Sequence, residues 1–282
     1  MDFSQSVAVI TGAGSGIGQQ LAIQLAQAGA KVAINDFNAE SLEQTAEEVR
    51  SHGGTVFSDA FDVSNREAMH NFAQMVEEQF GQVDMMINNA GVALGRMKLE
   101  EISYEDFQWL LNINLWGVIH GTVAFLPLLR QRPRAKLVNV CSSYGLLAVP
   151  EQSPYCTAKF AVRGFTDSLR LELMDTNVRV SLVCPSQVRT NIVRHGRHRT
   201  EAEKEKTIEQ FDTLMTCLSP ADGARIILRG LRKNRELIFV GRDSKIYNFA
   251  SRFTPQCIIK FVVRRELRKL AELDARSADS TP

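Results

Sequence analysis

Tyr155 and Lys159, four residues apart, are the side chains of this sequence best suited to exchange a proton with a substrate. The apolar periodicity of Tyr155–Met174 predicts a helix, so both side chains should share one face. A free tyrosine has a pKa of about 10, too high for efficient acid–base catalysis at neutral pH, and a nearby ammonium lowers that pKa. The pair is therefore a candidate general acid and base, although tyrosine and lysine are also common on solvated helix faces.

Ser142 stands 13 residues before Tyr155, at the end of the strand expected at Leu137–Cys141. Ligands of open parallel sheets bind at the carboxyl ends of strands. A hydroxyl there can hold a substrate oxygen against Tyr155. The alternatives are that Ser142 caps a turn or helix, or that the neighbouring Ser143 takes this role.

A glycine-rich turn follows the first predicted strand and reads Thr11-Gly12-Ala13-Gly14-Ser15-Gly16-Ile17-Gly18. Glycine permits positive φ angles and a close approach of backbone to ligand. The helix predicted after the turn presents free N–H groups and a positive dipole end to a pyrophosphate. A purely structural turn is the alternative, but the strand–turn–helix context predicts a dinucleotide site.

Asp36 ends the second predicted strand, 18 residues beyond Gly18. A carboxylate at this spacing accepts hydrogen bonds from both hydroxyls of the adenosine ribose and repels a 2′-phosphate. Neither Phe37 nor Asn38 is basic, so NAD is predicted rather than NADP. A solvated strand-end aspartate is the alternative.

The elements that must position these residues alternate along the first 240 residues. Short β-branched runs predict seven strands, and longer periodic stretches between them predict helices. This alternation predicts an α/β fold, a Rossmann-type doubly wound parallel sheet with helices on both faces. The strands are expected at Val7–Thr11, Lys31–Asn35, Thr55–Phe57, Asp84–Ile87, Lys136–Val140, Val178–Val183 and Leu237–Val240. The helices are expected at Gln19–Ala28, Ala39–Arg50, Asn65–Phe80, Ser103–Arg130, Tyr155–Met174 and Ala221–Arg232.

Composition narrows the classes of protein. The 282 residues are 44% hydrophobic with a formal net charge of +1, which suits a globular domain and gives no reason to expect a nucleic-acid partner. The five cysteines lack metal-ligand or CxxC spacing, so neither a metal site nor a disulfide framework is predicted. No signal peptide is recognised, and no uninterrupted apolar stretch approaches the roughly 20 residues that span a bilayer. A cytoplasmic protein is expected.

Two regions depart from the strand–helix pattern, a segment before the last predicted helix of the domain and the C-terminal extension. Arg189–Cys217 is polar, carries the basic cluster Arg194–Arg199 and is predicted to be a substrate lid. The cluster is interpreted either as a solvated face or as a site for an anionic group. The pocket is expected to be lined by this lid with Val92–Gly95, Gly145–Pro150 and Ser186–Gln187, including the apolar Leu94, Leu146, Leu147 and Val149.

The chain is divided into a dinucleotide-binding and catalytic domain, 1–241, and a C-terminal extension, 242–282. Apolar and basic residues are interleaved in the extension, which predicts a basic amphipathic helix and a polar tail. Such a helix can pack within the protein or on another subunit, or it can contact a membrane through 242–270.

Taken together, these motifs resemble those of the short-chain dehydrogenase/reductase family. The resemblance covers about residues 5–240 and rests on the glycine turn, Asp62-Val63, Asn88-Asn89-Ala90-Gly91, Asn114, Ser142, Tyr155, Lys159, Cys184-Pro185-Ser186, Val188 and Thr190. The family commonly has Pro-Gly where this chain has Pro185-Ser186, and a local adjustment of the loop is expected there.

The resemblance implies a catalytic tetrad of Asn114, Ser142, Tyr155 and Lys159, in which Asn114 holds a water that links Lys159 to solvent. Asn112 is the competing asparagine. Asp62 and Val63 would contact adenine, Lys159 the nicotinamide ribose, and Val188 and Thr190 the carboxamide. The residues expected at the cofactor are Gly12, Ser15, Gly16, Ile17, Gly18, Asp36, Asp62, Val63, Asn89, Ala90, Gly91, Tyr155, Lys159, Pro185, Val188 and Thr190.

The expected function is NAD(H)-dependent interconversion of a secondary alcohol and a ketone or aldehyde, on an apolar substrate. One alternative is an NADPH-dependent carbonyl or 3-oxoacyl reductase, and another is a membrane-bound lipid, retinoid or steroid dehydrogenase. A third, from another class, is a non-catalytic dinucleotide-sensing or scaffold protein. The resemblance also implies a homodimer or homotetramer.

Overall fold

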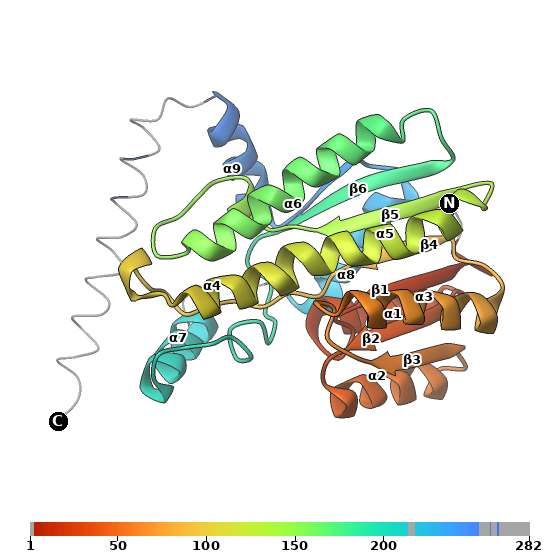
Figure 1. The fold of residues 1–282 in the computed structure, drawn as a ribbon, viewed down its shortest axis with the longest axis horizontal. Coiled ribbons are helices and arrows are strands. Elements are labelled where there is room, and N and C mark those ends of the chain that lie inside the picture. Colours follow the sequence, from red (N-terminus) through yellow and green to blue (C-terminus); the bar gives the residue numbers. More distant parts are fainter. Residues whose placement is uncertain (1–2, 214–217, 254–259, 261–263, 265–282) are drawn as a thin grey trace.

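The computed structural model describes residues 3–213 and 218–253 together with residues 260 and 264. Seven parallel strands form one sheet in the order β3-β2-β1-β4-β5-β6-β7 (Figure 1). The predicted doubly wound sheet is confirmed, because the chain starts at the centre, winds out to β3 and then returns to wind out to β7. The strands are β1 (Val7–Thr11), β2 (Lys31–Asp36), β3 (Val56–Ala60), β4 (Met85–Asn88), β5 (Ala135–Val140), β6 (Val178–Pro185) and β7 (Leu237–Val240).

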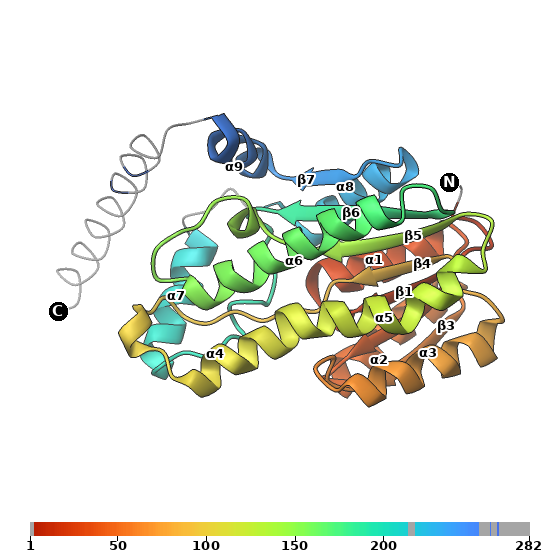
Figure 2. The same ribbon diagram turned by 45° about the horizontal axis from the view of Figure 1, so that its top comes forward.

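Helices cover both faces of the sheet because alternate strand residues point to opposite sides. In β1, Ala8 and Ile10 belong to one apolar cluster with α1, α2 and α8, whereas Val7 and Val9 belong to another with α3, α5 and α6. Figure 2 shows α5 and α6 lying along this second face. The first set comprises α1 (Gly16–Gln27), α2 (Ala39–Ser51) and α8 (Pro220–Arg232), and the second comprises α3 (Arg66–Phe80), α5 (Gly117–Arg130) and α6 (Ser153–Glu172).

The helix expected over Ser103–Arg130 is interrupted. α4 (Tyr104–Leu111) leads into a π-helical turn at Asn112–Trp116 before α5 begins, and such turns occur frequently at functional sites. Tyr104–Arg130 is long and apolar enough to meet the length and composition of a membrane span, which the sequence analysis did not predict. Half of its most apolar window is buried inside the protein, as in a helix that covers a sheet.

The predicted lid contains one helix, α7 (Glu201–Thr213), and its two ends lie together. Arg189 N donates to Leu218 O at 2.9 Å, and Leu218 N donates to Gln187 O at 3.0 Å. In the predicted extension, α9 (Arg242–Phe253) follows β7. Of the remaining residues of 242–282, all but 260 and 264 lie outside the described residues.

A lysine is buried near the start of β5, at the other end of that strand from Ser142. Lys136 of β5 is 2% exposed, and its Nζ donates to Asn234 Oδ1 at 2.6 Å. Burial, with a smaller contribution from the charge of Arg179, lowers the pKa of Lys136 from 10.5 to about 8. The unfolded chain therefore binds more protons than the folded protein between these two values, so the free energy of unfolding rises with pH across this window.

A substitution of Lys136 tests whether burial lowers the pKa of its side chain. We expect Lys136→Met to raise the free energy of unfolding at pH 7 by about 1 kcal/mol, because it removes a buried charge that no carboxylate pairs. The gain should shrink between pH 8 and pH 10, where the wild-type lysine loses its proton in the folded state. Urea unfolding at several pH values measures both effects, with Lys233→Met as the exposed control. An equal effect at pH 7 and pH 10 would contradict the assignment.

Candidate active site

The glycine turn lies where β1 and β4 meet, at the point where the direction of winding changes. Gly12 has a φ of +66°, and a Cβ there would lie 2.7 Å from Ala90 Cα. A Cβ at Gly18 would overlap the Gly12 carbonyl oxygen. These two positions require glycine, because the turn packs directly against the chain that leaves β4.

The start of α1 fits a phosphate group. The N-terminal cap of α1 is Ser15, which has extended backbone and makes no side-chain hydrogen bond to the helix. The amides of the first turn are therefore not capped by this side chain, and Ser15, Gly16 and Ile17 line the cavity. Backbone N–H groups and the positive end of the helix dipole are the donors that a pyrophosphate needs.

Asn89 holds the turn in place. Its Nδ2 donates to Thr11 O at 2.9 Å and to Gly12 O at 3.0 Å. In return, Thr11 Oγ1 accepts from the backbone N–H groups of Asn89 and Ala90, both at 3.1 Å. Four hydrogen bonds thus join the ends of β1 and β4. The sequence analysis placed Asn89 at the cofactor without predicting this contact, and it missed Thr11.

Asp36 lies over the same turn at the end of β2. Its Oδ2 accepts from Gly14 N at 2.9 Å, and its Oδ1 accepts from Asn38 N at 3.0 Å. A Cβ at Gly14 would approach Asp36 Cγ to 2.9 Å, so glycine permits this contact. None of the cavity-lining residues at this end is basic; they are Asn35, Asp36, Phe37, Ser41, Phe61, Asp62 and Val63.

Tyr155 and Lys159 lie on one face of α6, below the end of β5. Lys159 Nζ is 5.6 Å from the centroid of the Tyr155 ring. The lysine is 3% exposed, and its Nζ donates to Val140 O at 3.2 Å. Ser142 follows β5, and its hydroxyl oxygen accepts from Tyr144 N at 3.2 Å. The spacing in the sequence thus corresponds to one compact group of side chains.

Burial changes the acidity of both members of the pair. It raises the pKa of Tyr155 well above its usual value, and a hydrogen bond with Ser142 opposes this increase. Burial also lowers the pKa of Lys159, against the opposing influence of Cys141 and Cys184. Each shift favours the neutral form. A phenolate at Tyr155 therefore depends on positive charge brought close to the ring.

Several contacts missed by the sequence analysis position α6 against the end of β5. The ring of Tyr144 packs edge-on against that of Tyr155, with centroids 6.1 Å apart. Cys141 Sγ donates to the backbone oxygen of Lys159 at 3.2 Å. A Cβ at Gly145 would overlap Cys141 Sγ, so glycine is needed for this close packing. No spacing in the sequence identifies these residues.

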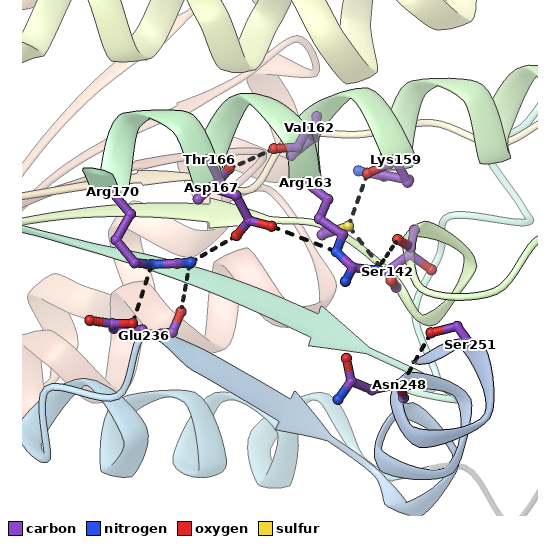
Figure 3. Close-up of polar contacts among 12 residues, drawn as sticks. Ser142, Lys159, Val162, Arg163, Thr166, Asp167, Arg170, Glu236, Asn248 and Ser251 are labelled. Atoms are coloured by element: carbon purple, nitrogen blue, oxygen red, sulfur yellow. Dashed lines mark hydrogen bonds and ion pairs between the residues drawn. The ribbon is translucent and has the colours of Figure 1, made fainter. Parts of the chain in front are cut away.

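Charged side chains on the side of α6 that is directed towards β6 and β7 attach the helix to its surroundings (Figure 3). Arg163 Nη1 donates to Gly145 O at 3.4 Å, and its Nε is 3.8 Å from Asp167 Oδ2. Asp167 also pairs with Arg170 at 2.7 Å, and Arg170 donates to the backbone oxygen of Glu236 at 3.2 Å. The network links the Ser142 turn, α6 and the chain entering β7, and so keeps Tyr155 and Lys159 in position.

Asn114 belongs to the π-helical turn and is completely buried. Its Oδ1 accepts from Val92 N at 2.7 Å, and its Nδ2 donates to Val92 O at 2.8 Å. A Cβ at Gly91 would lie 3.1 Å from Asn114 Oδ1 and 3.5 Å from Lys159 Nζ, so both side chains pack against this glycine. The competing Asn112 instead accepts from Gln108 at the surface. The role of Asn114 in holding a water remains a prediction.

One cavity of ≈ 800 Å³ connects these groups. Every residue predicted for catalysis or cofactor binding lines it except Gly18 and Asn114, which lie behind its wall. Leu94, Leu147 and Val149 line the cavity as predicted for an apolar pocket. Leu146 does not; it is 1% exposed and packs with Val118 and Cys141, because the turn after Ser142 directs it into the core.

The lid lies against the chain that follows β4. Gly95 N donates to Arg197 O at 2.8 Å, and Arg197 N donates to Ala93 O at 3.2 Å. The Arg197 guanidinium pairs with Asp106 at 2.8 Å and lies 4.1 Å above the Trp109 ring. The predicted basic cluster therefore makes ion pairs with the protein as well as lining the cavity at His195, Arg197 and His198.

The Pro185-Ser186 departure has a structural counterpart. Both the N–H and the hydroxyl of Ser186 donate to Val240 O, at 2.9 Å and 3.1 Å. Gly241, which follows Val240, has a φ of +99°, and a Cβ there would overlap Ser186 Oγ. The serine side chain is thus accommodated by a glycine more than 50 residues away in the sequence, which the sequence analysis did not predict.

Comparisons with known proteins agree with the family resemblance described in the sequence analysis. A family model described as short chain dehydrogenase matches residues 6–201. The putative oxidoreductase SadH of Mycobacterium tuberculosis is 37% identical over 252 residues, which cover 89% of this chain and 91% of that protein.

Two similar solved structures contain nicotinamide dinucleotides. A short chain dehydrogenase/reductase from Burkholderia phymatum, in complex with NAD, has a TM-score of 0.80 and 30% identity, with 96% of each chain covered. An alcohol dehydrogenase from Thermococcus sibiricus, complexed with 5-hydroxy-NADP, has a TM-score of 0.72 and 29% identity, with 84% of this chain and 96% of that chain covered.

The contacts of Asn89 generate a prediction. Asn89→Ala removes two donors from the carbonyls of Thr11 and Gly12, and we expect the free energy of unfolding to fall by about 1–3 kcal/mol. The glycine turn loses its main side-chain support, so dinucleotide affinity should fall by roughly tenfold. Thermal unfolding and fluorescence titration with NADH measure these effects, with Asn112→Ala as the control. Unchanged affinity in Asn89→Ala would show that the turn does not need this support.

Proposed function

The chain belongs to the short-chain dehydrogenase family of oxidoreductases, and we propose that it uses NAD(H) to interconvert a secondary alcohol and a ketone or aldehyde. The observation that carries the proposal is the single cavity that joins the glycine turn to Ser142, Tyr155 and Lys159. A non-catalytic dinucleotide sensor would not need an acid–base pair at the end of its binding cleft.

The residues of the cleft fit a nicotinamide dinucleotide. When bound, this cofactor supplies the hydride acceptor or donor of the reaction. The amides of the glycine turn would hold its pyrophosphate, and Asp36 would accept from the adenosine ribose hydroxyls. Asp62 and Val63 would contact adenine, whereas Pro185, Val188 and Thr190 would contact the nicotinamide end.

Proton transfer is the task of this chain's own side chains. In the oxidising direction, the Tyr155 phenolate accepts the proton of the substrate hydroxyl, while Ser142 donates a hydrogen bond to the same substrate oxygen and orients it. The Lys159 ammonium stabilises the phenolate and binds the nicotinamide ribose hydroxyls. Lys159 would then release a proton to solvent through a water held by Asn114 and take up the proton of Tyr155, which restores both the ammonium and the phenolate.

The substrate end of the cavity favours a molecule with an apolar part. Leu94, Leu147 and Val149 are joined there by Trp109 and by Tyr247, which α9 contributes. His195, Arg197 and His198 of the lid line the same cavity, and polar groups among apolar walls are what orients a small organic ligand. The homodimer or homotetramer, the cytoplasmic location and the division at residue 241 remain predictions.

The acid–base assignment predicts the behaviour of a conservative variant. Tyr155→Phe removes only the hydroxyl, so we expect kcat for secondary alcohols to fall by about 10²–10⁴-fold. The Kd for NADH should stay within about twofold, because the ring still packs in place. NADH absorbance with a panel of alcohols measures turnover, and Tyr247→Phe removes another hydroxyl from the same cavity as a control. Comparable losses in both variants would contradict a special role for Tyr155.

The carboxylate of Asp36 predicts the choice of cofactor. We expect the wild type to prefer NADH, and Asp36→Ala to lower the NADH-to-NADPH ratio of kcat/KM by about tenfold or more, because repulsion of the 2′-phosphate is removed. Asp36→Asn separates this repulsion from hydrogen bonding, since the amide still accepts hydrogen bonds. A wild type that prefers NADPH, or a ratio that Asp36→Ala leaves unchanged, would favour the reductase alternative.

A further inference from the structure

Helix α9 exposes a compact apolar stripe. Ile246, Phe249 and Phe253 are 60%, 63% and 70% exposed, although they are among the largest apolar side chains in this part of the chain. At roughly 100° per residue, the three positions fall within about 60° of one another around the helix axis. The rings of Phe249 and Phe253 lie 5.0 Å apart, so the stripe is continuous.

The opposite side of α9 is packed against the body of the protein. Ser244 is completely buried, and Tyr247 packs on the apolar cluster that contains Leu182 and Cys184. Asp243 and Tyr247 also line the active-site cavity. Since these contacts orient the helix, the exposed apolar stripe is part of the surface, on a helix that also contributes to the cavity wall. Figure 2 shows α9 at the edge of the molecule, beyond β7.

Basic residues lie on the same helix as the apolar stripe and beyond its C-terminal end. Arg242, Lys245 and Arg252 of α9 are exposed, as are Lys260 and Arg264 beyond it. Residues 242–269 contain eight Lys or Arg and two Asp or Glu, a net charge of +6. Because the whole chain carries +1, the rest of the protein carries −5. Of these basic residues, Arg242, Lys245 and Arg252 lie on α9 itself, so positive charge accompanies its exposed apolar stripe.

We propose that this face of α9, with the basic residues around it, docks on an anionic lipid bilayer. An interfacial helix buries an apolar stripe between lipid headgroups while Lys and Arg contact their phosphates or carboxylates. A two-fold contact between the α9 helices of two copies fits less well, because it would bring the positively charged 242–269 segments of both copies together. A purely acidic partner would leave the two phenylalanine rings in water.

Because α9 forms part of the cavity wall, docking would also affect how a substrate reaches the cavity. A docked enzyme would hold the wall formed by Tyr247 close to the bilayer, so an apolar alcohol or ketone dissolved in lipid would reach the cavity over a short path. This consequence rests on the proposed function, whereas docking itself does not. Vesicle binding without substrate tests docking even if the enzyme proves inactive on every alcohol.

The test is flotation of the full chain with vesicles of phosphatidylcholine alone or with about 30% phosphatidylserine. We expect binding to the anionic vesicles only, weakened as salt rises from 0.1 M to 1 M because the screening length falls from about 10 Å to about 3 Å. The double variant Phe249→Ser with Phe253→Ser should bind about tenfold more weakly. The matched control, Leu99→Ser with Tyr104→Ser, removes two exposed apolar side chains elsewhere and should bind like the wild type.

Charge is tested separately. Lys245→Gln with Arg252→Gln should weaken binding by roughly tenfold, whereas Lys233→Gln with Arg235→Gln removes two exposed charges outside the face and should not. Retained NADH binding shows that each variant is folded. No binding to anionic vesicles, or equal losses in variants and controls, would overturn the proposal. So would light scattering that shows an oligomer in the wild type and monomers in the phenylalanine variant, because α9 would then be a subunit contact.

Discussion

Burying the Lys159 ammonium beneath the cavity removes a positive charge from water, and the surrounding structure compensates for that cost in several ways. The Val140 carbonyl, at the end of a parallel strand, accepts a hydrogen bond from Nζ. Gly91 provides space beside it, and the π-helical turn brings the Asn114 side chain against the same glycine. The charge that burial disfavours is the one that a phenolate at Tyr155 requires, so stability and chemistry oppose each other at this residue.

The parallel sheet explains why the remaining groups meet at one edge. Its strands all end at the same side, so the glycine turn after β1, Asp36 at the end of β2, Asn89 after β4 and Ser142 after β5 lie along one cleft. Hydrogen bonds between Asn89 and the glycine turn join the two central strands at the point where the winding changes direction. On the far side, the ion pair of Arg170 with Glu236 joins α6 to the chain that enters β7, whereas Arg163 pairs with Asp167 within α6.

The lid and α9, which follow Ser142, Tyr155 and Lys159 in the sequence, form part of the cavity wall. The lid pairs with the chain after β4, and α9 adds Tyr247 from beyond the last strand. One cavity therefore extends from the strands that would bind adenine to the helix that exposes Ile246, Phe249 and Phe253. The substrate end is shaped by the segments that depart from the strand–helix pattern, which is where related folds are able to differ in substrate without changing their chemistry.

The amino-acid sequence by itself determined the seven strands, the glycine turn, Asp36 and the spacing of Tyr155 and Lys159, because each depends on local periodicity or on residues close together in the chain. Only the tertiary structure decided that Leu146 packs in the core, that a π-helical turn interrupts Ser103–Arg130 and that Gly241 accommodates Ser186. It also decided which side chains support the pair, among them Tyr144 and Cys141. These features arise from contacts between segments far apart in sequence, and such contacts are set when helices pack on the sheet rather than by any local pattern.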